Sequence, residues 1–365
     1  MTENKVSEEF DVVVVGGGAA GLAGALTLAR ARRSVLVVDS GEPRNAPAAG
    51  AHGLLSRDGV PPLELLRIGR EEVAGYGGRV VSDRAVRARR EEGGFVVETG
   101  SGRGFRARRL LVTTGLVDEL PEVPGLRERW GRDVLHCPYC HGWEVRDAPI
   151  GVLGGGPLSL HQALLFRQWS PRVTLFLHTG ADLAEEQWER LAARGIAVVD
   201  GEVTGLAVED DRLAGVRLAS GRLVPVEALA VAPRMVARGE VLSGLGLRAV
   251  EHPRGVGTHV ASDASGLTEV AGVWVAGNVT DPLAGVPLAQ AAGVQAAMAI
   301  NADLVEADTD AAVARRRAVV SGGAAGDVFG PAEEAEVSAR VLGDRRHGLD
   351  PVGRTVGGTE GAERP

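Results

Sequence analysis

Residues 11–39 read DVVVVGGGAAGLAGALTLARARRSVLVVD. The stretch begins with a short apolar run, as a buried parallel strand does, and a second such run at 34–38 leads into Asp39. Between the two runs stand a G-x-G-x-x-G motif at 16–21 and a helical pattern at 22–32. Strand, motif, helix, strand and acidic residue together make the dinucleotide-binding fingerprint. The sequence therefore predicts an α/β fold whose first unit binds a dinucleotide.

The sequence pattern predicts a structural role for each glycine of this motif. Gly16 allows a tight turn, Gly18 lets a pyrophosphate approach the backbone, and Gly21 allows the helix to pack closely on the strand. The N–H groups at the start of the helix would bind the phosphates, and Asp39 would accept hydrogen bonds from a ribose. The alternative is a glycine-rich turn without a ligand.

A second unit further along the chain repeats the pattern. An apolar strand at 150–153 runs into Gly154-Gly155-Gly156, and a helical stretch leads to a second strand at 172–177. Ser159 stands where the third glycine is expected, and the second strand ends in His178-Thr179-Gly180. This end lacks both an acid for a ribose and an arginine pair for a 2′-phosphate. We expect the unit to be a retained scaffold that binds NAD(P)H poorly or not at all.

Both cysteines of the chain lie in one tetrapeptide, Cys137-Pro138-Tyr139-Cys140. The C-x-x-C spacing is typical of a reversible dithiol/disulfide pair. A structural zinc site requires four ligands, and neither a second cysteine pair nor paired histidines could complete one, so we expect no metal. The sequence predicts a redox disulfide at the start of a helix with Pro138 in its first position. The alternative is a pair of inert thiols.

Two histidines, His136 and His141, flank this pair. An imidazole can take a proton from an incoming thiol and stabilise a thiolate. We take His141 as the first candidate base and His136 as the second. The alternative for each is a ring that is held by local backbone groups.

The composition restricts the class of partner and the compartment. With 40 Lys and Arg against 48 Asp and Glu, the formal net charge is −8, which counts against nucleic acid and against an anionic membrane surface. No apolar run approaches the roughly 20 residues that span a membrane, and the polar start of the chain is unlike a signal peptide. The sequence predicts a cytoplasmic protein, and disulfides in that compartment are usually catalytic.

The order of these motifs resembles the low-molecular-weight thioredoxin reductases, which are FAD-dependent pyridine nucleotide-disulfide oxidoreductases. The resemblance covers roughly residues 10–305 and includes the position of the C-x-x-C pair between the two glycine-rich units. It rests on Gly16-Gly17-Gly18-Ala19-Ala20-Gly21, Thr113-Thr114-Gly115, Cys137-Pro138-Tyr139-Cys140, Gly154-Gly155-Gly156 and Ala276-Gly277-Asn278.

Three positions depart from the reductase pattern. His141 replaces an Asp, Asn278 replaces the Asp of a Gly-Asp pair, and His178-Thr179-Gly180 replaces His-Arg-Arg. This combination looks more like the dithiol oxidases of microbial disulfide natural products, of the gliotoxin and holomycin types. That resemblance implies that electrons pass from a small dithiol through FAD to O2. It also implies that Cys137 exchanges with the substrate and that Cys140 faces the flavin.

Two other functions stay open at this point. One is a thioredoxin-disulfide reductase that draws on NAD(P)H or another electron donor and acts on a thioredoxin-like protein. The other is a flavin-bound redox sensor with slow turnover. The family resemblance also implies a homodimer, whereas the sequence does not disclose the identity of the dithiol.

The resemblance implies two Rossmann-like dinucleotide-binding domains, the second inserted in the first. The FAD-binding domain would comprise residues 1–119 and 250–310, with a final helix at 288–304. The inserted NAD(P)-like domain, 120–249, would carry the C-x-x-C pair. The remaining C-terminal extension, 311–365, is predicted to form a short helix followed by disordered residues.

The candidate site residues fall into two groups. Catalytic roles are expected for Cys137, Cys140, His141 and His136. The FAD-binding candidates come from the glycine motif, the loop after the second strand, the two later strand ends and the last helix. They are Gly16, Gly18, Ala19, Ala20, Gly21, Asp39, Ser40, Arg44, Asn45, His52, Thr114, Gly115, Gly277, Asn278, Asp281 and Gln290.

Overall fold

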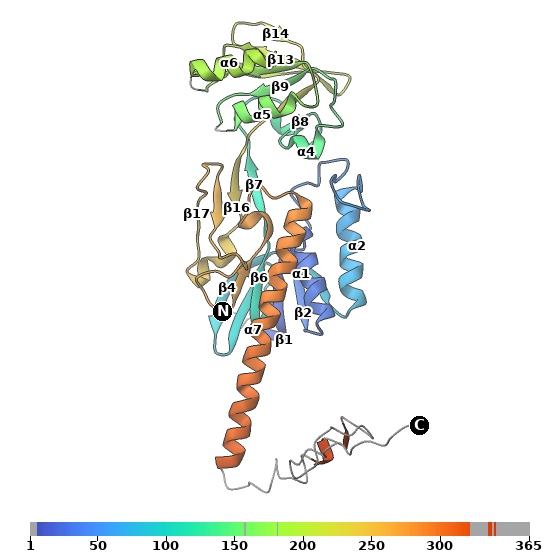
Figure 1. Ribbon diagram of the computed structural model, residues 1–365, viewed down its shortest axis with the longest axis vertical. Coiled ribbons are helices and arrows are strands. Elements are labelled where there is room, and N and C mark those ends of the chain that lie inside the picture. Colours follow the sequence, from blue (N-terminus) through green and yellow to red (C-terminus); the bar gives the residue numbers. More distant parts are fainter. Residues whose placement is uncertain (1–5, 157, 181, 322–334, 338, 341–365) are drawn as a thin grey trace, which may run out of the picture. The chain divides into compact units, whose positions relative to one another are not determined.

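The computed structural model describes residues 6–156, 158–180, 182–321, 335–337 and 339–340. The chain divides into two compact units, of which the first ends at Asp303 and the second begins at Leu304. The two sheets and the site described below belong to the first unit (Figure 1).

The first sheet is built around the fingerprint strand. Its spatial order is β3-β2-β1-β6-β5-β4, and β19 pairs with the second half of β6. The strands next to β1 run parallel to it, as the βαβ pattern requires, whereas β4, β5 and β6 form an antiparallel meander. The bounds are β1 Val6–Val15, β2 Val35–Asp39, β3 Arg79–Ser82, β4 Ala85–Glu91, β5 Gly94–Thr99, β6 Gly104–Val112 and β19 Val273–Val275.

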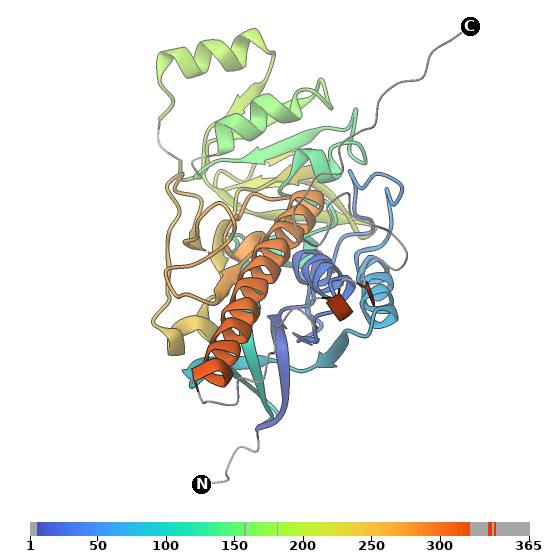
Figure 2. The same ribbon diagram turned by 60° about the horizontal axis from the view of Figure 1, so that its bottom comes forward.

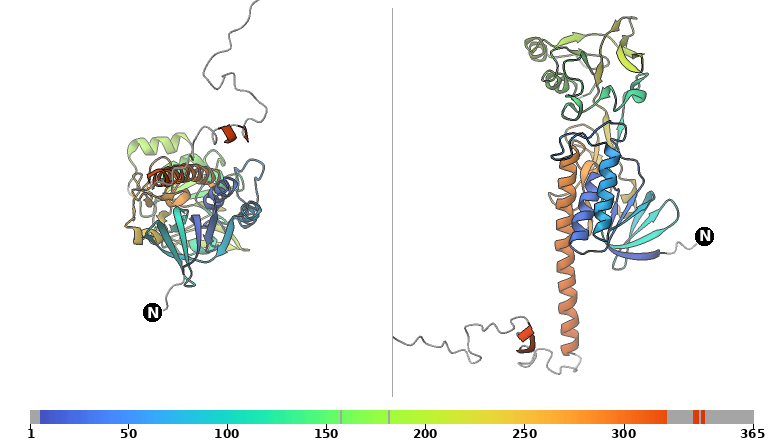
Figure 3. Two further views of the ribbon diagram at one scale, coloured as in Figure 1. Left: turned by 90° about the horizontal axis from the view of Figure 1, so that it is seen from below. Right: turned by 90° about the vertical axis from the view of Figure 1, so that its right-hand side faces the viewer.

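Helices α1 (Ala19–Arg30), α2 (Pro62–Gly75) and α7 (Val286–Ser321) accompany this sheet. Figure 3 shows α1, and α7 up to Asp303, on one face of the sheet, and Figure 2 shows the same two helices from another side. They cross at glycines: a Cβ on Gly293 would lie 2.0 Å from the carbonyl oxygen of Ala20. The absence of side chains at this crossing lets the two backbones approach closely.

The second sheet has five parallel strands in the order β11-β10-β9-β15-β8. Their apolar side chains form two buried clusters with those of the helices and of a small antiparallel sheet, β12-β13-β14. Two parallel sheets with glycine-rich first turns confirm the predicted α/β class. The bounds are β8 Val134–Leu135, β9 Ile150–Leu153, α5 Ser159–Phe166, β10 Val173–Phe176, α6 Glu185–Ala193, β11 Ala197–Val199, β12 Val203–Glu209, β13 Arg212–Leu218, β14 Leu223–Val224 and β15 Ala228–Ala230.

A two-stranded ribbon connects the two sheets. β7 (Leu116–Glu119) carries the chain out of the first sheet, and β16 (Arg234–Ala237) pairs antiparallel with it on the way back. Residues just after β16, including Val241 and Leu242, already pack in the core of the first sheet. The chain therefore returns earlier than residue 250, while the predicted domain bounds stay a prediction.

The remaining elements are short. They are α3 Leu126–Arg129, α4 Pro138–His141, the 3-10 helices η1 Glu240–Leu245 and η2 Gly277–Val279, and the hairpin of β17 Ala249–Glu251 and β18 Thr258–Val260. No helix within the described ranges combines the length and the apolar character that crossing a bilayer requires.

The last predicted helix is longer than expected. It was placed at 288–304, whereas α7 continues to Ser321. Residues 305–321 contain neither Gly nor Pro and include many alanines and arginines, so no stop signal precedes Gly322. The extension therefore begins as helix. The short helix predicted for the extension was expected at 332–342, and of that range the structure describes only 335–337 and 339–340, which are helical.

Candidate active site

One cavity of about 1040 Å³ joins the glycine motif to the cysteine pair. Its wall comes from the turn between β1 and α1, the loop after β2, the strand end at Thr113–Leu116, α4, and the loop before α7. Nearly all of the predicted site residues contribute to this wall. Gly21, Asp281 and Gln290 do not, and Asp281 instead lines a second cavity of about 390 Å³ beside His252 and His259.

The glycine motif forms an open cradle at one end of the cavity. Gly16 has a φ of +104°, and a Cβ there would lie 2.6 Å from the carbonyl oxygen of Thr113. A Cβ on Gly21 would lie 1.9 Å from the carbonyl oxygen of Gly16, so the helix packs directly on the turn. At Gly18 no atom lies within 4 Å of the Cβ position. The backbone there faces open space, as close approach of a phosphate requires.

Asp39 is held at the end of β2 by two donors. Its Oδ1 accepts from the backbone N–H of Gly17 at 3.0 Å, and its Oδ2 accepts from the Arg70 guanidinium at 3.1 Å. The carboxylate therefore has a fixed orientation at the cavity wall. Arg70 was not predicted, because nothing in the pattern of α2 distinguishes it from the other exposed charges of that helix.

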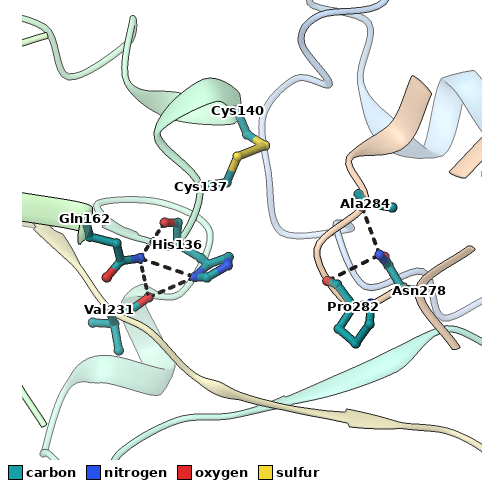
Figure 4. The surroundings of a disulfide bond; sticks show 8 residues. All are labelled: His136, Cys137, Cys140, Gln162, Val231, Asn278, Pro282 and Ala284. Atoms are coloured by element: carbon teal, nitrogen blue, oxygen red, sulfur yellow. Dashed lines mark hydrogen bonds between the residues drawn. A yellow bond between two sulfur atoms is a disulfide. The ribbon is translucent and has the colours of Figure 1, made fainter. Parts of the chain in front are cut away.

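The cysteine pair lies at the other end of the cavity (Figure 4). Cys137 precedes α4, and Pro138 takes the first helical position, as the sequence predicts. Cys137 and Cys140 form a disulfide with a Cα–Cα distance of 5.3 Å, which is within the usual range. The pair therefore lies in the wall of the same cavity as the dinucleotide cradle.

His136 is held by backbone groups and lines the cavity. Its Nδ1 lies 3.2 Å from the carbonyl oxygen of Val231, and Gln162 donates to the carbonyl oxygen of His136 at 2.9 Å (Figure 4). Burial lowers the pKa of His136, and the nearby positive charge of Arg44 lowers that pKa further. A neutral ring that donates through Nδ1 leaves Nε2 as a proton acceptor. Gln162 was not predicted.

His141 directly follows the cysteine pair. Both of its ring nitrogens are shielded from solvent, and neither has a hydrogen-bond partner among the described residues. Burial lowers the pKa of His141, although the carboxylate of Glu144 acts in the opposite direction. A neutral imidazole without a partner beside Cys140 can accept a proton from a ligand in the cavity.

The loop after β2 is anchored by an ion pair. Arg44 donates to both carboxylate oxygens of Asp118 at 2.7 Å, and the Asp118 side chain is only 6% exposed. The pair ties the loop to β7. Two further residues of this loop, Asn45 and His52, line the cavity, and His52 lies 3.4 Å from Glu144. Asp118 was not predicted, because its partner is distant in the sequence.

The second glycine-rich turn is occupied by the chain's own groups. The Ser159 hydroxyl accepts from the Gly156 N–H at 3.2 Å and donates to the Gly156 carbonyl oxygen at 2.9 Å. His178 accepts from the N–H of Val203 at 3.0 Å through Nδ1. A pyridine nucleotide would have to compete with Ser159 for the N–H of Gly156, whereas the bond of His178 is made to β12 and uses no group of the turn.

The chain belongs to the pyridine nucleotide-disulphide oxidoreductase family, whose sequence pattern matches residues 10–296. Thioredoxin reductase sirT of Leptosphaeria maculans is 30% identical over 317 residues, which are 82% of this chain and 95% of that protein. A probable thioredoxin reductase of Arthroderma benhamiae is 37% identical over 152 residues, which are 40% of this chain and only 38% of that relative's length.

Among solved structures, that of HlmI is 47% identical, with a TM-score of 0.79, and the match covers 86% of this chain and 97% of that one. These findings confirm the predicted resemblance to the thioredoxin reductases. They also confirm the predicted class of enzyme, an oxidoreductase that acts on sulfur groups.

Proposed function

We propose that this protein is an FAD-dependent dithiol oxidase that closes an intramolecular disulfide in a small molecule, with O2 as the final acceptor. One observation carries the proposal: the Cys137–Cys140 disulfide and the first glycine motif line one cavity. In the second glycine-rich turn, in contrast, the N–H of Gly156 already donates to the Ser159 hydroxyl. This arrangement favours dithiol over NAD(P)H as the source of electrons.

The cavity fits FAD at its glycine-rich end. Gly18 leaves room for a pyrophosphate, and Asp39 offers a fixed carboxylate to a ribose. Asn45, Thr114 and Asn278 line the space between this end and the cysteine pair. Bound FAD would supply the acceptor for an electron pair from the cysteines and pass that pair to O2.

The cysteine pair would carry out the exchange with substrate. A substrate thiolate attacks Cys137 Sγ, the Cys137–Cys140 bond breaks, and Cys140 leaves as a thiolate. The second substrate thiolate then attacks the substrate sulfur of this mixed disulfide and releases Cys137. The substrate loses two electrons and two protons and closes its own disulfide, while the cysteine pair gains both electrons.

The two histidines would accept the protons of the substrate thiols. His136 and His141 both have lowered pKa values because they are buried, so their rings are neutral at neutral pH. A neutral imidazole with a free nitrogen is the form that acts as a base. In the sequence, His136 directly precedes Cys137 and His141 directly follows Cys140, so each sulfur has one candidate base next to it in the chain.

A thioredoxin-disulfide reductase is the second candidate, with a thioredoxin-like protein as partner. The names of several relatives, such as thioredoxin reductase sirT, favour it. The third candidate is a flavin-bound redox sensor with slow turnover. We propose a homodimeric, cytoplasmic protein for each of these functions.

An anaerobic reduction experiment distinguishes the three. The FAD-loaded protein is mixed with NADPH, NADH or dithiothreitol, and the visible flavin absorbance is followed. The dithiol oxidase is expected to lose this absorbance with dithiothreitol alone, and to form hydrogen peroxide once air is admitted. Rapid bleaching by a nicotinamide nucleotide would refute the proposal in favour of the reductase, and slow bleaching by every donor would favour the sensor.

A further inference from the structure

We propose that Asn278 is a positioning residue, whose side-chain amide fixes the loop Asp281–Gly285 as part of the cavity wall. The loop leads from η2 into α7, and Pro282, Leu283 and Ala284 line the cavity that contains the cysteine pair. Figure 4 shows Asn278 and this loop in the surroundings of the disulfide. The inference rests on the proposed function in that FAD and a dithiol would occupy this cavity.

The amide nitrogen of Asn278 reaches three carbonyl oxygens of the loop. Nδ2 donates to Asp281 at 3.0 Å, to Ala284 at 2.9 Å and, more weakly, to Pro282 at 3.5 Å. Among the described residues, it is the only donor to the carbonyl oxygens of Pro282 and Ala284. Both of these residues are buried, so their carbonyl groups would be costly to leave unpaired.

A neutral amide supplies the hydrogens that these contacts use. An ionised Asp of the same shape has no hydrogen to donate and would bring negative charge against three carbonyl oxygens. The remaining polar atom, Oδ1 of Asn278, has no partner within the described part of the chain, and Asn278 itself lines the cavity. One side chain therefore holds the loop and presents an uncharged acceptor to a ligand.

This arrangement assigns Asn278 a role different from the direct FAD contact that the sequence predicts. The amide fixes the loop through its hydrogen bonds. The position of the loop then sets the width of the cavity that also contains Cys137 and Cys140. A shift of about 1 Å in such a wall is enough to lower a rate by roughly 100-fold. The residue would therefore control where the reacting groups meet without taking part in the reaction.

The test compares N278D, N278A and N278S with N301D as the matched control. Asn301 works as an acceptor, since its Oδ1 receives the Arg33 guanidinium at 2.8 Å, so Asp can replace it without loss of that bond. In the ligand-free protein, hydrogen exchange of the Leu283 and Ala284 N–H groups is expected to quicken about tenfold in N278A and N278D. N278S keeps one donor, so its exchange rates should lie between those of N278A and the wild type. N301D should exchange at the wild-type rate.

Two further measurements test the consequence for the cavity. Titration of the apoprotein with FAD, followed by flavin fluorescence, is expected to give about tenfold weaker binding in N278A and N278D at pH 8. As the pH falls to 4, close to the usual Asp pKa of about 3.9, roughly half of the N278D carboxyl groups are protonated and can again donate to a carbonyl oxygen, so N278D should regain part of its affinity while N278A does not. The carboxylate of Asp281, which lies in the same loop, is the same in both variants and does not alter this comparison.

The outcomes separate the two proposals. Unchanged hydrogen exchange in N278A, or no difference between N278D and N278A at low pH, would overturn the role of Asn278. A wild-type protein that binds FAD but oxidises no dithiol would overturn the proposed function, while the exchange and affinity series would still decide the role of Asn278. If N278A fails to fold, N278S and the pH response of N278D provide the test.

Discussion

Two buried histidines flank Cys137 and Cys140 in the sequence, and their rings differ in their hydrogen-bond partners. His136 is tied to the Val231 carbonyl group, whereas the ring nitrogens of His141 have no partner among the described residues. Nδ1 of His136 is therefore already bound and its Nε2 is left as an acceptor, whereas both nitrogens of the buried His141 ring are without a bond to the described residues. Single-residue changes should therefore separate the sulfur chemistry from the proton transfers.

Replacing Cys140 with Ser is expected to abolish turnover of dithiothreitol by the FAD-loaded protein, by at least about 10³-fold. The disulfide is then lost, while the glycine cradle that would bind FAD is untouched. Oxygen consumption measures the rate, and flavin fluorescence measures FAD binding, which should stay within about twofold of the wild type. Full turnover in this variant would remove Cys140 from the mechanism.

The lowered pKa of His136 predicts a pH-dependent stability. Because burial keeps the folded-state pKa below the unfolded value of about 6.5, the unfolded chain binds the proton more readily. The contribution of the neutral His136 ring to the free energy of unfolding is therefore fully present above about pH 6.5. It is lost as the pH falls through the lower, folded-state pKa.

In His136→Asn, this decline between pH 7 and pH 5 is expected to be shallower in urea titrations. His161, an exposed histidine, provides the control, since His161→Asn should leave the slope as it is in the wild type. An equal slope in all three proteins would show that His136 is not the residue that titrates.

At the scale of elements, the loop after β2 and strand β7 are joined by the Arg44–Asp118 pair. Asp118→Asn removes the charge of an almost completely buried partner and leaves Arg44, which is 25% exposed, without it. We expect a loss of about 1–3 kcal/mol in the free energy of unfolding, measured by urea denaturation. Glu64→Gln, at a solvent-exposed pair on α2, should cost clearly less. Equal costs would contradict the structural role of the buried pair.

The crossing of α1 and α7 makes a second prediction at this scale. A methyl group at Gly293 would meet the backbone of Ala20, so Gly293→Ala should destabilise the protein by about 1–3 kcal/mol. A Cβ at Gly75, in the last turn of α2, meets nothing within 4 Å. Gly75→Ala is therefore expected to be neutral or to stabilise by up to about 1 kcal/mol. Thermal unfolding of both variants measures the difference.

For the whole molecule, ligand binding should distinguish the two glycine-rich units. A ligand at 100 times its dissociation constant stabilises a protein by about 2.7 kcal/mol, which is roughly 3–4 °C in the unfolding midpoint of a chain of this size. We expect FAD to produce such a shift and NADPH to produce less than about 1 °C, because Ser159 already uses the N–H of Gly156 in the second turn. A large shift with NADPH would refute this expectation.

How much of the fold and of the site could be predicted from the sequence depends on how local each feature is. The glycine motif and the helix start at Pro138 depend on neighbouring residues, so the fold class and the cysteine turn could be predicted. The partners of the site could not: Arg70 is 31 positions from Asp39, and Arg44 is 74 positions from Asp118. The sequence pattern does not indicate which charged side chains the tertiary fold brings together.

Asn278 illustrates a related limit. Its place after Gly277 marks it as a site residue, but its hydrogen bonds depend on the conformation of the following loop, which no period or motif predicts. The predicted end of α7, at residue 304, was wrong for a different reason. Helix formers continue past Leu304 without a glycine or proline, and the resemblance, which ends near that residue, favoured an earlier stop.

The pairing of β7 with β16 determines where the polypeptide could be shortened. Glu119 and Arg234 are register partners, so the two ends of the segment between them are neighbours across an antiparallel pair, about 5 Å apart. A short hairpin could therefore replace the whole intervening segment without disturbing the strands on either side. Such a truncated polypeptide would keep the glycine cradle, where we propose that FAD binds, and would lose both cysteines. It could therefore be used to ask whether cofactor binding and sulfur chemistry are separable.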